Sequence, residues 1–181
     1  MKKFVVAPLL AALAMFVWGF LYYGLSGIPY KALGTANADV LPAVANLFPA
    51  DGTYVLPDPR TPPEALAEQM KRGQFAMVHV RKSGVKEMDP MILANGFLLE
   101  FVSCLLLAFI MHKVELGPRT FGCRLMFCVV TGVLVTLFAN GGQAIWWQQG
   151  WGWHLMTMLH DVVAFLLAGI VLASLHASKA A

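Results

Sequence analysis

The chain has 181 residues, of which 59% are hydrophobic and 13% are charged. Soluble proteins carry about 25% charged residues, so this composition and a mean hydropathy of +0.67 exclude an ordinary soluble domain. The formal net charge is +3, but the basic residues form no stripe with interleaved aromatic side chains, which argues against a nucleic-acid partner. We therefore expect an integral membrane protein whose first partner is the lipid bilayer.

Four apolar runs have the length that crosses a bilayer, about 20 residues at 1.5 Å each. The first run, Phe4 to Leu25, is longer than the apolar core of about 7 to 15 residues of a signal peptide, so we expect an uncleaved membrane helix over residues 1–25. The other three helices are predicted over 91–112, 121–140 and 151–175 within residues 91–181. The predicted fold is an all-α membrane protein with a bundle of four transmembrane helices.

The long connection over residues 26–90 has the local signals of folded structure. The segment TPPEALAEQMKRG has Thr61 as a predicted N-cap, prolines in the first turn and Gly73 as terminator, which predicts a helix over 62–72. β-Branched and aromatic residues predict strands near 52–56 and 75–81, and a weaker helix is expected around 39–47. The sequence thus predicts a small α/β insertion between the first two membrane helices.

Basic residues predict the orientation. They flank the ends of the spans that share one side of the membrane: Lys2, Lys3, Lys113, Arg119, Arg124 and Lys179. By the positive-inside rule these ends and both termini face the cytoplasm, so residues 26–90 are extracytoplasmic. The expected location is the bacterial inner membrane, which the chain crosses four times.

Two acidic residues interrupt the second and fourth predicted helices. Glu100 and Asp161 each lie nine to ten residues below the outer end of their helix, which places both carboxylates about 13 to 15 Å deep. Exposing such a group to lipid costs about 2.5 to 3.5 kcal/mol on insertion scales, so both should be internal. Helical spacing predicts one buried polar cluster, which consists of Glu100, Asp161, His154, Asn95, Asn140, Thr157 and Tyr22.

Two interpretations of this cluster are open. Two acids close together in a low dielectric would share a proton or rely on His154 or His160, which indicates a functional site. Alternatively, Glu100 and Asp161 separately hydrogen-bond to backbone, Tyr22 or Asn95 and only hold the helices together.

The stretch GGQAIWWQQGWGWH, residues 141–154, joins the third and fourth predicted helices and begins in a turn at Gly141. Trp146, Trp147, Trp151 and Trp153 are typical of the aromatic belt at the head-group layer. The alternative is that they stack on a ring-shaped ligand. No cofactor is predicted, and binding of haem, a quinone or a pigment stays open.

Residue patterns for catalysis and for metal binding are missing from the sequence. It has no nucleophile elbow, phosphate-binding loop or HExxH motif, so no catalytic residue is predicted and no enzymatic reaction is supported. The three cysteines lack metal-ligand spacing, and no metal site is predicted. His112 and His176, near the ends of their helices, are weak candidates for a pair of haem ligands.

Two segments carry a resemblance. The segments FVWGFLYYG in the first span and WGWHLMTMLHDVVAFLLAGIVLASL in the last resemble small four-helix bacterial membrane proteins that are grouped as a domain of unknown function. In that family an aromatic motif ends the first span, and a Trp-led final span carries a polar residue followed by a glycine. The resemblance covers these two spans, and it implies the four-helix fold and no activity.

The small size, the missing catalytic motifs and the outer module favour a non-catalytic accessory or structural subunit of a larger membrane complex, such as an energy-transducing one. Such a subunit would dock on other membrane-protein subunits through its outer module and helix faces. The alternative is a small proton-coupled carrier or a lipophilic-ligand binding protein that uses Glu100, Asp161 and His154.

Overall fold

The structure is a computed structural model that describes residues 2–86 and 88–175; Lys179 and His176 lie outside them. The described part is mostly helical and has one two-stranded sheet. Its contacts divide the chain into two compact units, one of Met1–Gly34 with Pro90–Ala181 and one of Thr35–Asp89. Each unit is described by itself.

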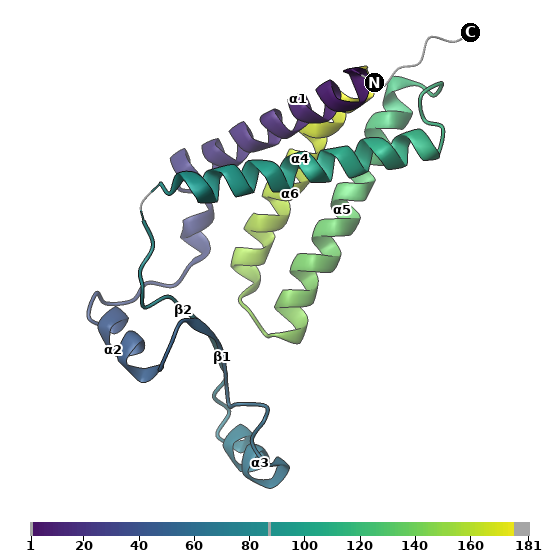
Figure 1. Cartoon of the computed structure of the whole chain (residues 1–181). Helices are drawn as coiled ribbons and strands as arrows, with labels where there is room; N and C mark the ends of the chain where they lie inside the picture. The colour runs from purple at the N-terminus through teal and green to yellow at the C-terminus, as the bar shows by residue number, and fades with distance from the viewer. Residues whose placement is uncertain (1, 87, 176–181) are drawn as a thin grey trace. The chain divides into compact units, whose positions relative to one another are not determined.

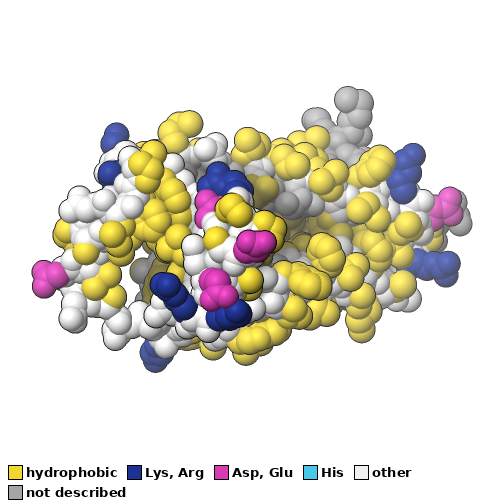
Figure 2. All heavy atoms as spheres, turned by 90° about the horizontal axis from the view of Figure 1, so that it is seen from below, with side chains coloured by type: hydrophobic (Ala, Val, Ile, Leu, Met, Phe, Trp, Pro, Cys, Tyr) yellow, Lys and Arg dark blue, Asp and Glu magenta, His cyan; other side chains and the backbone are white. Residues whose placement is uncertain are grey.

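Four helices of the first unit are long and apolar enough to cross a membrane, which confirms the predicted number of spans (Figure 1). The first span combines an α-helix with a π-helical continuation over Phe20–Leu25. The α-helices are α1 (Lys2–Gly19), α4 (Pro90–Lys113), α5 (Phe121–Trp146) and α6 (Trp151–Leu175). Hydrophobic side chains cover the helices on the face drawn in Figure 2, as a multi-pass membrane protein requires.

Helix α1 packs against α4 and α6, and α5 packs against α6. The α5–α6 contact is close because Gly132 leaves room for Phe165, whose Cβ would lie 2.4 Å from a Cβ added at Gly132. Helices α4 and α5 meet near their connecting loop, where Cys128 Sγ is 3.6 Å from Met111 Sδ. From there the two helices diverge (Figure 1).

Arg124 closes the end of the α5–α6 pair. Its side chain is only 6% exposed, and its Nε donates to the carbonyl oxygen of Ala173 at 2.8 Å. Its Nη1 donates to the carbonyl oxygens of Gly117 and Arg119. The sequence indicates only a flanking charge at this position, whereas the structure shows a guanidinium that ties the α4–α5 loop to the last turns of α6.

The connection between α5 and α6 is shorter than predicted. Helix α5 does not end at Asn140 but continues through Gly141 to Trp146, so only residues 147–150 join the two helices. The predicted turn at Gly141 is therefore wrong. Gly141 is buried, and an added Cβ would lie 3.8 Å from Met158 Cε; packing against α6 outweighs the low helix propensity of glycine here.

Residues 26–34 belong to the helical unit and not to the insertion. They contain a 3₁₀ helix over Pro29–Ala32 that contacts α6. A Cβ added at Gly152 would lie 3.4 Å from the Ala32 Cβ. The insertion proper is therefore shorter at its N-terminal side than the predicted range.

The second unit contains α2 (Val40–Leu47), β1 (Gly52–Leu56), α3 (Pro63–Lys71) and β2 (Ala76–Val80). The strands are antiparallel, with Gly52 opposite Val80 and Leu56 opposite Ala76. The predicted cap of α3 is wrong: the N-cap residue is Pro62, without a side-chain hydrogen bond. The Thr61 N–H instead donates to the Asp58 carbonyl in a turn at 3.0 Å.

Candidate functional site

The carboxylate of Asp161 on α6 is held by two side chains of α5. Thr136 Oγ1 donates to Asp161 Oδ2 at 2.7 Å, and Asn140 Nδ2 donates to the same oxygen at 3.2 Å. Asn140 Nδ2 also donates to Thr136 Oγ1 at 2.9 Å. Thr136 and Asn140 are four residues apart, so both face α6 from adjacent turns of one helix. Asp161 is thus a fixed hydrogen-bond acceptor between the two helices.

His160 uses the other oxygen of this carboxylate, with its Nδ1 3.0 Å from Asp161 Oδ1. An ionised carboxylate only accepts hydrogen bonds, so the proton of a neutral His160 sits on Nδ1 and the Nε2 atom keeps its lone pair. Nε2 is buried and has no hydrogen-bond partner in the described part of the chain. A Cβ added at Gly19 would lie 3.5 Å from it. The imidazole therefore presents a basic nitrogen to the interior, close to the backbone of α1.

Aromatic rings from the first span surround His160. The ring centroids of Trp18, Tyr22 and Tyr23 lie 6.2, 5.4 and 4.8 Å from the imidazole centroid. Trp18 Nε1 donates to the His160 carbonyl oxygen at 3.1 Å, and the Tyr22 hydroxyl donates to the Met156 carbonyl oxygen at 2.9 Å. Consecutive residues of an α-helix do not face the same neighbour. Tyr22 and Tyr23 both contact His160 within the π-helical segment, and such segments are frequent at functional sites.

Glu100 on α4 approaches the same imidazole. Its Oε2 atom is buried without a hydrogen-bond partner among residues 2–86 and 88–175, and its carboxyl group lies within electrostatic range of His160. Asp161 receives its hydrogen bonds from Thr136, Asn140 and His160. Each acid is therefore a neighbour of His160, and no hydrogen bond joins the two carboxyl groups within residues 2–86 and 88–175.

A second histidine connects this cluster to the α5–α6 loop. His154 is 5% exposed; its Nδ1 is 3.4 Å from Asn140 Oδ1, and its Nε2 is 2.9 Å from Gln149 Oε1. The Gln149 Nε2 in turn donates to Gln143 Oε1 at 3.3 Å. Polar side chains thus form a continuous sequence of contacts from Gln149 in the loop through His154 and Asn140 to Asp161.

The structure brings most of the predicted cluster together. Glu100, Asp161, His154, Asn140 and Tyr22 all lie in or directly around it. One predicted member, Asn95, is exposed on α4. The Thr157 hydroxyl donates to the Trp153 carbonyl oxygen of its own helix at 3.1 Å and is also a hydrogen-bond neighbour of the Tyr23 side chain.

The predicted cluster omits several members of the site, although the sequence places Thr136 on the interface face of its helix and names His160 as a possible partner of the two acids. Thr136 lies four residues before Asn140 on the same face of α5, a spacing that does contain the signal. His160 is off the predicted stripe of α6, and its role depends on the position of α1. Gln149 and Tyr23 have no distinguishing pattern in the sequence.

The four predicted belt tryptophans lie at neighbouring ends of α5 and α6. Trp146 is 81% exposed, and Trp147 and Trp151 are also exposed, as expected of rings in the head-group layer. Trp153 is half-buried and differs from the others: its ring centroid lies 6.2 Å from that of Tyr23 and 6.5 Å from that of Tyr30. It therefore extends the aromatic surroundings of His160 towards the helix ends.

Metal binding finds no support within residues 2–86 and 88–175, where no group of three or more His, Cys, Asp or Glu side chains could hold an ion. The carboxyl, imidazole, hydroxyl and amide groups of the cluster can donate and accept hydrogen bonds.

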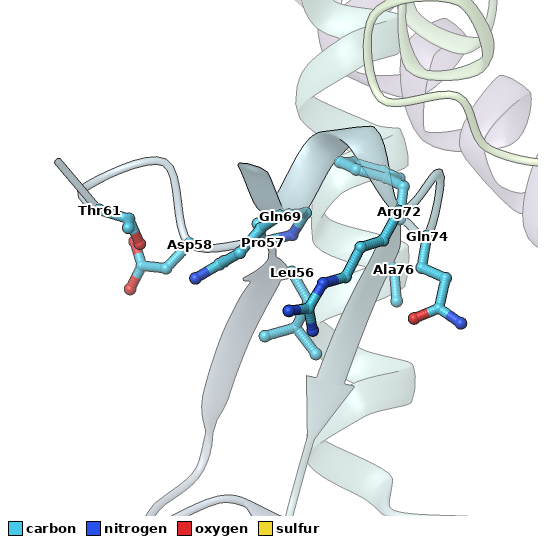
Figure 3. A pocket seen from close by; sticks show the side chains of 9 residues that line it. Leu56, Pro57, Asp58, Thr61, Gln69, Arg72, Gln74 and Ala76 are labelled. Atoms are coloured by element: carbon cyan, nitrogen blue, oxygen red, sulfur yellow. The ribbon is translucent and has the colours of Figure 1, made fainter. Parts of the chain in front are cut away.

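A separate pocket of about 580 Å³ lies in the second unit, between α3 and the end of the strand pair at which Leu56 faces Ala76. Figure 3 shows the Arg72 guanidinium above the side chains of Leu56 and Ala76, with Asp58 beside Thr61. Arg72 is exposed, and the Asp58 carboxylate is paired with Arg60. The pocket is an open surface feature without a buried titratable group, in contrast to the cluster between the helices.

Comparison of the chain with protein-family models, with curated proteins and with solved structures finds no match.

Proposed function

We propose that this chain is a proton-coupled membrane protein that takes up and releases a proton at Glu100 and His160 in the bilayer interior. The observation that carries the proposal is that Glu100 Oε2 and His160 Nε2 are both buried without a hydrogen-bond partner in the described structure, and that the two side chains lie within electrostatic range of each other. Unpartnered polar groups in lipid are costly and are usually functional.

Each neighbour of His160 has a definite part in this exchange. Asp161 holds the Nδ1 proton in place, so Nε2 is the nitrogen that accepts another. In its neutral form the Glu100 carboxyl can give its proton to Nε2, directly or through one water, which produces a carboxylate and an imidazolium. The Asp161 carboxylate and the ring faces of Trp18, Tyr22 and Tyr23 stabilise that cation.

Infrared spectroscopy of the purified protein in lipid nanodiscs tests the proposal. We expect a protonated-carboxyl band that disappears as the pH is raised and that is missing from the Glu100→Gln variant. Ser103→Ala is the matched control on the same helix, because the Ser103 hydroxyl bonds to the Leu99 carbonyl oxygen. A carboxyl spectrum that is the same in wild type and Glu100→Gln, or that does not respond to pH, would contradict the proposal.

The proposal retains the expected orientation in the inner membrane, with cytoplasmic termini and an extracytoplasmic insertion. Cys123 provides the test, because it is exposed near the basic α4–α5 loop whereas Cys104 and Cys128 are buried. A membrane-impermeant maleimide should label Cys123 in inverted vesicles and not in intact cells with a permeable outer membrane. Labelling of Cys123 in intact cells would show that the protein has the opposite orientation in the membrane.

A second candidate function is the accessory subunit of a larger complex. The observation that favours it is the divergence of α4 from α5, which leaves α4 packed along α1 (Figure 1). A helix of another subunit, rather than lipid, would then lie between α4 and α5. Native mass spectrometry after mild detergent extraction should detect a stable hetero-complex; a lone monomer would contradict this candidate and leave the proton-coupled function intact.

A further inference from the structure

His154 is buried with an amide oxygen at each ring nitrogen. Asn140 Oδ1 lies 3.4 Å from Nδ1, and Gln149 Oε1 lies 2.9 Å from Nε2. A neutral imidazole has one donor and one acceptor nitrogen, so it can satisfy only one of two oxygen partners. The protonation of His154 therefore depends on whether the Asn140 and Gln149 amides both keep their oxygens directed at the ring.

The orientation of Asn140 follows from Asp161. Asn140 Nδ2 donates to Asp161 Oδ2 at 3.2 Å, and the carboxylate oxygen cannot donate in return. The Asn140 amide therefore has to turn its oxygen towards His154, and His154 Nδ1 has to carry a proton.

The orientation of Gln149 follows from its own second bond. Gln149 Nε2 donates to Gln143 Oε1 at 3.3 Å, which directs Gln149 Oε1 to His154 Nε2. In this arrangement Nε2 has to carry a proton as well. The hydrogen-bonding pattern is that of an imidazolium.

We propose that His154 is a second proton-binding site, occupied as an imidazolium whose charge is balanced by Asp161, to which it is linked by hydrogen bonds through the Asn140 amide. This inference deepens the proposed function, because it assigns a proton site on the loop side of the interior pair Glu100 and His160. The same Asp161 carboxylate contacts both branches: Oδ2 bonds to Asn140, and Oδ1 faces His160 Nδ1. One negative charge thus balances a proton on His154 or on His160.

The exchange of this proton with water is coupled to the Gln149 amide. Gln149 lies in the short connection of residues 147–150, between the exposed Trp147 and Trp151. When His154 Nε2 loses its proton, the lone pair faces the Gln149 oxygen, and the repulsion is removed when the amide turns and presents its NH₂ group. The rotation of Gln149 therefore accompanies release of the proton at the helix ends.

Nitrogen NMR of protein labelled with ¹⁵N-histidine, in nanodiscs at neutral pH, tests the proposal. Wild type should show one histidine with two protonated ring nitrogens, and this signal should be lost in His154→Gln. If the signal lost in His154→Gln belongs to a neutral ring, with one protonated and one free nitrogen, the Gln149 and Gln143 amides have the reverse orientation and the proposal is wrong.

Two further variants test the part of Gln149. Gln149→Leu removes the acceptor at Nε2, so the His154 signal should change to that of a neutral ring, whereas Gln149→Glu should keep the imidazolium. Gln148→Leu, the exposed neighbour in the same connection, is the matched control and should leave the signal unchanged. An imidazolium that persists in Gln149→Leu would overturn the role of this amide.

The result is distinguishable from a failure of the proposed function. A carboxyl band at Glu100 that does not respond to pH, together with an imidazolium at His154, would reject the interior exchange and retain the second site. A titrating Glu100 together with a neutral His154 would do the reverse.

Discussion

Asp161 Oδ1 lies 3.0 Å from Nδ1 of His160, its immediate neighbour in α6. Consecutive residues in an α-helix point about 100° apart, so this contact forms only because the imidazole is turned towards the carboxylate. The ring is held in that position by Trp18, Tyr22 and Tyr23 of the first span. The position of α1 therefore determines which nitrogen of His160 is available for a proton.

Replacing Asp161 by Asn should destabilise the packing of α5 against α6 and should no longer fix the proton of His160 on Nδ1. The amide has one acceptor oxygen in place of two. His160 therefore has to move its proton to Nε2 and accept from the new NH₂ group, or one of Thr136, Asn140 and His160 loses its acceptor. An unsatisfied buried group costs about 1 to 3 kcal/mol. The measurement is the thermal unfolding midpoint in detergent, with Thr136→Val as a milder variant that should cost about 1 kcal/mol. An Asp161→Asn protein as stable as wild type would show that the hydrogen bonds of this carboxylate do not hold α5 to α6.

Replacing Gly132 by Ala should push α5 away from α6. The added Cβ would lie 2.4 Å from Phe165 Cβ and 2.5 Å from Phe165 Cγ, and overpacking of this kind costs about 1 to 3 kcal/mol. Gly96→Ala is the matched control, because nothing lies within 4 Å of a Cβ added there, and it should be neutral or slightly stabilising. Unfolding midpoints of the two variants in the same detergent provide the comparison. Equal midpoints would mean that Phe165 moves aside at little cost.

The sequence predicts the long helices well because their signal is local. Helix α6 begins and ends where hydropathy places it, at Trp151 and Leu175. Helix α5 continues six residues beyond the predicted end at Asn140, because Gly141 packs against α6 and this contact depends on another helix. A local propensity rule cannot anticipate it.

In the polar cluster, too, the members that depend on local helical spacing are predicted from the sequence, and those that depend on another helix are not. Asn140, His154 and Asp161 are found from their helical spacing, because each faces the interior of its own helix pair. His160 is named from the sequence only as an alternative partner of the acids, because its place depends on α1 and on a π-helical segment that hydropathy does not distinguish from an α-helix. The sequence leaves open whether Glu100 and Asp161 pair directly. In the structure each of them is a separate neighbour of the His160 imidazole.

In the second unit, Asp51 should stabilise the strand pair at neutral pH and not in acid. Hydrogen bonds from the Ser83 hydroxyl and the Lys82 N–H hold the pKa of its carboxyl below the ordinary 3.8. A carboxyl with a lowered folded pKa adds stability above its ordinary pKa, and this stability is lost as the pH falls through the lowered value. In Asp51→Asn the amides of β1 and β2 should therefore exchange faster than in wild type at neutral pH, and the difference should shrink in acid.

Hydrogen exchange followed by mass spectrometry measures this effect, expressed as protection factors so that intrinsic pH effects cancel. Asp58→Asn is the control. The pKa of Asp58 is lowered to about 2 by Arg60, a neighbour two residues away, so this pair does not connect the strands. A loss of protection that is equal in the two variants would contradict the role of Asp51.

Replacing Arg124 by Met should loosen the end of the α5–α6 pair. The carbonyl oxygens of Gly117, Arg119 and Ala173 then lose their donor, and each unsatisfied buried group costs about 1 to 3 kcal/mol. Cys128 lies one turn further along α5 and is fully buried, so its reaction with N-ethylmaleimide in detergent reports local opening. Each 1.4 kcal/mol lost should make the reaction about tenfold faster.

Arg119→Met removes an exposed basic side chain from the same loop and should leave the rate unchanged, while the exposed Cys123 reacts rapidly in every variant. Arg124→Lys should resemble Arg124→Met, because an ammonium group lacks the planar set of donors that reaches carbonyl oxygens on both α6 and the loop. A wild-type rate in Arg124→Met would show that packing of α5 against α6 closes this end without the guanidinium.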